Sequence, residues 1–77
     1  MTLCFILMKV KAGSVEIVIK ALNQIPEVKE AYTVTGEIDI IAKVEVKDLE
    51  SIAKVVLSKI HQTEGVDRTS THIVVPL

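Results

Sequence analysis

The sequence is poor in aromatic residues and in cysteine, and each scarcity excludes a class of protein. Phe5 and Tyr32 are its only aromatic residues, too few for the stacking platforms on which RNA-binding modules hold bases. Its single cysteine, Cys4, excludes an internal disulfide and is typical of a reducing compartment. Cys4, His61 and His72 lack the spacing of zinc ligands, so neither a metal site nor another cofactor is expected. We interpret His61 as a solvated helix end and His72 as a strand residue hydrogen-bonded to a neighbour.

Concentrated positive charge and catalytic motifs are also missing. The net charge is −1, and the nine Lys and Arg residues form no cluster, so no direct binding of nucleic acid is expected. The three glycines are isolated, which excludes a phosphate-binding loop. Ser70 has no base near it except His72 on the same strand. An enzyme of the acylphosphatase type would need a phosphate cradle that contains arginine, and Arg68, the only arginine, lies on the last expected strand. We therefore expect no catalytic residues and no enzymatic activity.

Length and composition predict a single domain over residues 1–77. The N-terminal apolar run, Leu3 to Met8, is too short for a signal peptide or a membrane span, which favours a cytoplasmic location without a membrane partner. Apolar residues make up 49% of the chain, and Val and Ile predominate among them, as suits a sheet. A chain this short and this aliphatic is expected to bury some of its surface against another copy of itself.

Hydrophobic periodicity predicts the order β-α-β-β-α-β. The first strand is apolar at its odd-numbered and its even-numbered residues alike, as in a central strand that is covered on both faces. Ser14 and Asp48 are expected to cap the two helices, and Pro26 and His61 to close them. In chain order we expect a strand over residues 3–8, a helix over 15–25, strands over 28–35 and 38–46, a helix over 49–60 and a strand over 66–75.

Right-handed crossovers fold this order into an α+β, ferredoxin-like domain. It has a four-stranded antiparallel sheet, with the strands expected in the order 4-1-3-2, and two helices on one face. The second face of the sheet is bare in a monomer. Because the first strand is apolar on that face too, we expect two copies to oppose their sheets in a dimeric α/β sandwich.

The stretch from Thr33 to Ile41 organises the rest of the chain. Gly36 can adopt a positive φ, which predicts a tight hairpin between the second and third strands. The period of two then places Ile38 on the core face and Asp39 on the opposite face. A carboxylate at that position is either a solvated turn residue or one end of a binding site.

Two runs resemble the effector domain of the Lrp/AsnC family, the RAM module. They are PEVKEAYTVTGEIDII-x-KV over residues 26–44 and the T-x-T-x-IVV run over residues 69–75. The resemblance covers essentially the whole chain. Family regulators carry a helix-turn-helix domain before this module, whereas the sequence begins at the module's first strand. It therefore resembles the stand-alone form that lacks the helix-turn-helix domain.

The resemblance implies that a free amino acid binds between subunits. A zwitterion needs hydrogen-bond donors for its carboxylate and an acceptor for its ammonium group, and we expect an apolar or small polar amino acid. The implied contacts are Gly36, Glu37 and Ile38 through their backbone, Asp39 through its carboxylate, and Thr69, Ser70 and Thr71 through hydroxyls from a neighbouring subunit.

The resemblance thus implies an amino-acid-binding regulatory module. It would form a dimer, or a ring of dimers such as an octamer, and act on full-length Lrp/AsnC-type transcription regulators. Two alternatives remain open: an ACT-like regulatory subunit of an amino-acid metabolic enzyme, and a structural assembly protein with a vestigial site. In that last case Thr69 and Thr71 would simply be good edge-strand residues.

Overall fold

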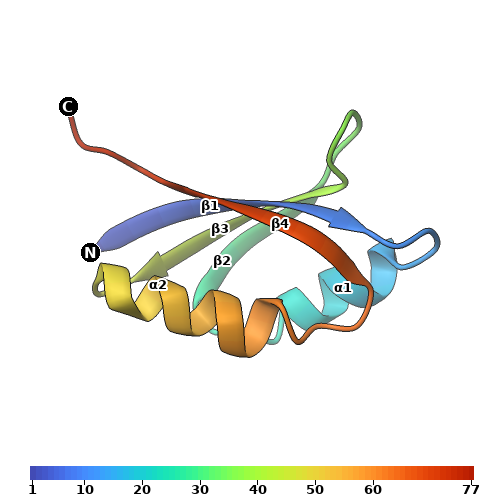
Figure 1. Ribbon diagram of the computed structural model, residues 1–77, viewed down its shortest axis with the longest axis horizontal. Helices are drawn as coiled ribbons and strands as arrows, with labels where there is room; N and C mark the ends of the chain where they lie inside the picture. The colour runs from blue at the N-terminus through green and yellow to red at the C-terminus, as the bar shows by residue number, and fades with distance from the viewer.

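Four antiparallel strands form one sheet, and both helices lie against the same face of it (Figure 1). The computed structural model describes residues 1–77. The strand order β2-β3-β1-β4 is the predicted order, and the α+β architecture is confirmed. No helix has the length and apolar character needed to cross a membrane. The elements are β1 (Thr2–Val10), α1 (Val15–Leu22), β2 (Val28–Thr33), β3 (Ile40–Val46), α2 (Leu49–Val55), the π-helical η1 (Val56–Ile60) and β4 (Val66–Ile73).

The two central strands, β1 and β3, bury alternate residues against the helices. The even-numbered residues of Cys4–Val10 and of Ile40–Val46 are all buried there. The opposite side of β1 carries Leu3, Phe5 and Leu7, which are half-buried and have no helix over them. We call this side, which faces away from both helices, the open face of the sheet. Within this chain β1 is therefore covered by helices on one face only.

The helix α1 is shorter than predicted. It ends at Leu22 and not next to Pro26. The next N–H groups each donate to the carbonyl three residues earlier and not four: Gln24 to Ala21, and Ile25 to Leu22. Ser14 occupies the N-cap position, but its side chain makes no capping hydrogen bond. The prediction that its hydroxyl caps the helix is wrong.

The second helical segment begins as predicted and ends differently. Asp48 Oδ1 accepts hydrogen bonds from the Ser51 N–H at 2.8 Å and from Ser51 Oγ at 2.7 Å, which confirms the N-cap. After Val55 the helix widens into η1, and the N–H of His61 donates to the Val56 carbonyl at 2.8 Å. The apolar spacing predicted the helix but not this π-turn.

A β-bulge interrupts the alternation of faces along β2. Val28 pairs with Val44, whereas Glu30 pairs with Lys43, so the register shifts between Val28 and Glu30. As a result Val28 and Ala31 both pack against the core. A strict period of two would place Val28 and Ala31 on opposite faces.

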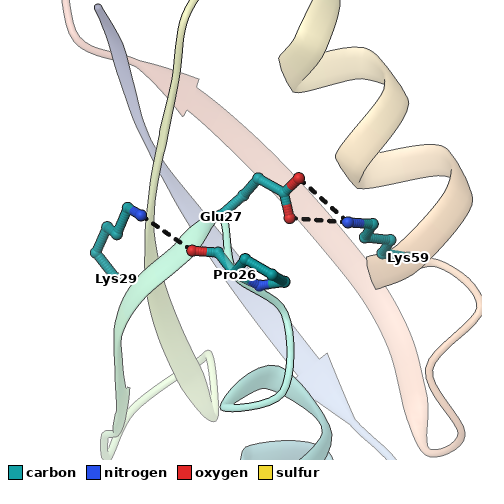
Figure 2. Close-up of polar contacts among 4 residues, drawn as sticks. All are labelled: Pro26, Glu27, Lys29 and Lys59. Atoms are coloured by element: carbon teal, nitrogen blue, oxygen red, sulfur yellow. Dashed lines mark hydrogen bonds and ion pairs between the residues drawn. The ribbon is translucent and has the colours of Figure 1, made fainter.

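An ion pair joins η1 to the loop before β2 (Figure 2). Lys59 Nζ lies 2.9 Å and 3.1 Å from the two carboxylate oxygens of Glu27. The hydrogen bond from Lys59 lowers the pKa of the Glu27 carboxyl below its usual value. Beside it, Lys29 Nζ donates to the Pro26 carbonyl at 3.0 Å.

The predicted tight hairpin is wrong. β2 stops at Thr33 and β3 starts at Ile40, so residues 34–39 form a loop that projects beyond the sheet (Figure 1). The Val34 N–H closes this loop on the Asp39 carbonyl at 2.9 Å, while the Asp39 N–H donates to the Met8 carbonyl of β1 at 2.8 Å. The entry to β3 is therefore tied to β1 as well as to β2.

Candidate functional site

A shallow cavity of about 220 Å³ lies where the loop over residues 34–39 meets the ends of β1 and β4. Three segments contribute to it, and most of the lining side chains are polar or charged. The lining residues are Leu7 and Lys9 of β1, Glu37 and Ile38 of the loop, and Arg68, Thr69 and Ser70 of β4. The loop and β4 are the two segments that the sequence singled out. The structure therefore brings Glu37, Ile38, Thr69 and Ser70 together, and adds Leu7, Lys9 and Arg68 to them.

Asp39 borders this cavity without lining it. Its Oδ2 accepts a hydrogen bond from the Val10 N–H at 2.9 Å, and Lys9 Nζ lies 3.9 Å from the same oxygen. The β1–β4 register is irregular between Lys9 and Val10, and Asp39 supplies the acceptor for the Val10 amide there. The carboxylate is thus not a free turn residue, because one of its oxygens, Oδ2, holds the loop against β1.

The tip of the loop presents unpaired backbone amides. Gly36 has φ +116°, the positive value predicted from the sequence. The N–H groups of Gly36, Glu37 and Ile38 have no acceptor within the chain. Successive free amides beside a glycine turn are donors that an anion such as a carboxylate can accept from.

The hydroxyls of β4 alternate between the two faces of the sheet. Thr69 pairs with Met8 and Thr71 with Ile6, so both threonines are on the helix side. Ser70 pairs with Leu7, on the open face. The three hydroxyls that the sequence grouped together do not converge on one point within a single chain.

Each of the two histidines contacts one of these hydroxyls. His61 Nε2 lies 2.8 Å from Thr69 Oγ1, which joins the end of η1 to β4. His61 is an exposed residue at the end of η1, as the sequence predicted, and the contact with Thr69 is an addition to that prediction. His72 Nε2 lies 2.8 Å from Ser70 Oγ, which confirms that this residue is hydrogen-bonded to a neighbour on its own strand. No group of three or more His, Cys, Asp or Glu residues is arranged to hold a metal ion.

Thr71 lies farther along β4, at a separate apolar groove. This groove has a volume of about 410 Å³ and runs between α2, η1 and β4. Its other lining residues are Leu49, Ile52, Ala53, Val56, Leu57 and Ile73. Thr71 is therefore not in the polar cavity of its own chain.

Sequence reasoning missed the two cations of the site, Lys9 and Arg68. They are direct partners in the β1–β4 register, and both line the cavity. Arg68 makes no ion pair within the chain. The only signal in the sequence was that each lies near the end of an expected strand, and their proximity follows from the register, which the sequence does not reveal.

Comparisons with known proteins place the whole chain among domains of one kind. The family model of the Lrp/AsnC ligand binding domain matches residues 3–76. The HTH-type transcriptional regulator FL11 of Pyrococcus furiosus is 40% identical over 72 residues, which are 94% of this chain and 47% of that protein. The crystal structure of FFRP-DM1 is 41% identical with a TM-score of 0.93, and the match covers 97% of this chain and 100% of that one.

A more distant match shares the fold. The transcriptional regulator NMB0573 of Neisseria meningitidis, solved as a complex with L-Met, is 21% identical with a TM-score of 0.90. The match covers 97% of this chain and 50% of that one. The chain thus spans about half the length of the curated relatives that it matches.

Proposed function

Because the chain belongs to the family of Lrp/AsnC ligand-binding domains, we propose that it is an amino-acid-binding regulatory module that modulates Lrp/AsnC-type transcription regulators. Its curated relatives are regulators of transcription and not enzymes. We place its action in the cytoplasm, where such regulators work. The observation that carries the proposal is the polar cavity beside the loop over residues 34–39, with its unpaired amides and nearby carboxylates.

The cavity offers a partner for each end of a zwitterion. The free N–H groups of Gly36, Glu37 and Ile38 would donate to the α-carboxylate of the ligand. The Glu37 carboxylate lines the cavity, and the Oδ1 atom of Asp39 makes no hydrogen bond within the chain. Either oxygen acceptor would take the ammonium group by a charge-assisted hydrogen bond. NMB0573, which contains this fold, was solved as a complex with L-Met.

The hydroxyls of β4 would complete the site. Thr69 and Ser70 line the cavity of their own chain. Thr71 lies farther along β4, at the separate apolar groove, so a role for Thr71 would require a neighbouring copy to bring it to the ligand. This requirement agrees with a site placed at a subunit boundary.

We further propose that the module forms a dimer through the open face, alone or as part of a ring of dimers such as an octamer. Leu3, Phe5 and Leu7 of β1 lie on this face. Leu7 pairs with Ile41 of β3, and Tyr32 of β2, which is 55% exposed, pairs with Ile41 from the other side. Such an apolar stripe on a central strand is typical of a surface that a partner covers.

Thermal unfolding in the presence of each of the twenty amino acids tests the proposal. A ligand that binds only the folded protein at a hundredfold excess over its dissociation constant should stabilise it by about 2.7 kcal/mol. Light scattering on the same samples would report the mass of the assembly. If none of the twenty raises the melting temperature, the proposed function is wrong.

A further inference from the structure

Two positive charges face one another at the rim of the candidate site. Lys9 on β1 and Arg68 on β4 are direct cross-strand partners and line the same cavity. Like charges directly opposite on neighbouring strands destabilise a sheet. An anion bound between them would remove that repulsion.

The chain itself supplies little negative charge to this pair. Lys9 Nζ is 3.9 Å from Asp39 Oδ2, an oxygen that also accepts the Val10 N–H, and Arg68 has no ion pair. Glu37 is the only carboxylate among the lining residues, and it forms no ion pair either. The lining thus carries two cations and one anion.

A neutral zwitterion would not satisfy this lining. Its carboxylate would bind the loop amides, its ammonium group would bind Glu37, and both Lys9 and Arg68 would remain without a strong partner. A second carboxylate on the ligand would fit between them, since the guanidinium of an arginine binds a carboxylate through two parallel hydrogen bonds.

We propose that the ligand is an acidic amino acid whose side-chain carboxylate is held by Arg68 and Lys9. This inference rests on the proposed function and specifies the class of its ligand. It replaces the sequence-based expectation of an apolar or small polar amino acid, which took no account of these two cations. In this site the charge of the ligand side chain, more than its size, determines which amino acid binds.

Isosteric ligand pairs test the inference on the unmodified protein. Titration calorimetry at constant pH and ionic strength would compare L-glutamate with L-glutamine, and L-aspartate with L-asparagine. In at least one pair the acid should bind at least about tenfold more tightly than its amide, because the amide cannot form the charge-assisted contact. Equal affinities within both pairs, or tighter binding of the amides, would overturn the proposal.

Three variants assign the preference to its residues. Arg68→Gln and, independently, Lys9→Gln should weaken binding of the acid and reduce its advantage over the amide. Lys54→Gln removes the same charge from an exposed position on α2, away from the cavity, and should leave the preference intact. If Arg68→Gln and Lys9→Gln both retain the full preference, the cations do not hold the ligand and the inference is wrong.

The failure of this inference can be told apart from the failure of the proposed function. A neutral amino acid that raises the melting temperature, with no effect from the acidic ones, would overturn the acidic ligand and leave the regulatory module standing. The absence of any effect from all twenty would overturn both.

Discussion

The carboxylate of Asp39 has two oxygens, and the fold uses only one of them. Oδ2 accepts the Val10 N–H and lies near Lys9, whereas Oδ1 makes no hydrogen bond within the chain. A single side chain can therefore secure the loop to β1 and still offer an acceptor to a ligand. For this reason a substitution at this position is expected to affect stability as well as binding.

We expect Asp39→Ala to lower the free energy of unfolding by about 1–3 kcal/mol, because it leaves the partly buried Val10 N–H without an acceptor. Asp39→Asn keeps an oxygen at the same place and should cost less. Urea denaturation of the two variants without ligand measures the difference. An Asp39→Ala protein that unfolds at the same urea concentration as the parent would show that water replaces the carboxylate at no cost.

A second residue-level prediction concerns pH. The pKa of Glu27 is lower in the folded chain than its ordinary value of 4.5, chiefly because Lys59 donates a hydrogen bond to it. A lowered folded-state pKa means that the stabilisation is present above the unfolded-state pKa, and is lost as the pH falls through the folded-state pKa. Because both side chains are partly exposed, the pair should contribute at most about 1 kcal/mol.

Glu27→Gln should therefore lower the free energy of unfolding at neutral pH by no more than that amount, and the difference from the parent should disappear in acid, below the folded-state pKa of Glu27. Denaturant titrations of both proteins from neutral pH into acid measure this. Glu64→Gln, at an exposed position without an ion pair, serves as the control. A difference that persists unchanged in strong acid would mean that Glu27 acts through packing and not through its charge.

Among the elements, those with an uninterrupted pattern were predictable. Alternation along β3 predicted its buried face, and the apolar spacing after Asp48 predicted the start of α2. The strand β1 was predicted as a strand, but its sequence is apolar at odd and even positions alike and did not reveal which face the helices cover. The bulge in β2 and the π-turn of η1 were not predictable, because each depends on how neighbouring elements pack and not on local composition.

The features of the candidate site also divide into those that the sequence predicted and those that it did not. The corner at Gly36 was predictable because a glycine between two β-branched runs indicates a turn, and its positive φ is confirmed, whereas the length of the loop over residues 34–39 was not predicted. The pairing of Lys9 with Arg68 was not, since it depends on the register of two strands that are far apart in the sequence. The bond from the Val10 amide to Asp39 arises at an irregularity of the same register.

The two helix starts offer a matched comparison. Asp48 accepts two hydrogen bonds from Ser51, whereas Ser14 occupies the N-cap position of α1 without any side-chain bond. We expect Asp48→Ala to lower the melting temperature and Ser14→Ala to leave it nearly unchanged, because only the first removes a capping acceptor. Thermal unfolding followed by circular dichroism compares them. Equal losses in the two variants would contradict this account.

The molecule as a whole has a core on one side of its sheet. Its 14 buried apolar residues form one cluster between the sheet and the helices. The open face lies outside this cluster and still carries the apolar side chains of the central strand β1. A second copy placed there would convert a two-layer domain into a sandwich with covered sheets, and would bury apolar area that a small chain cannot bury alone.

Phe5 lies on the open face of β1, between Lys43 of β3 and His72 of β4, so a charge introduced there would meet the proposed partner directly. We expect the parent protein to scatter light as an assembly of at least twice the 8.4 kDa chain. Phe5→Glu should shift it towards the monomer, because a carboxylate is costly to bury in an apolar interface even with Lys43 beside it. Ile17→Glu makes the same kind of change at a half-exposed position on α1 and should leave the assembly intact.

Circular dichroism confirms that each variant is folded before its mass is compared. A parent of monomeric mass at micromolar concentration, or a folded Phe5→Glu protein with the mass of the parent assembly, would show that the open face is not the interface. The apolar stripe along β1 would then need another explanation.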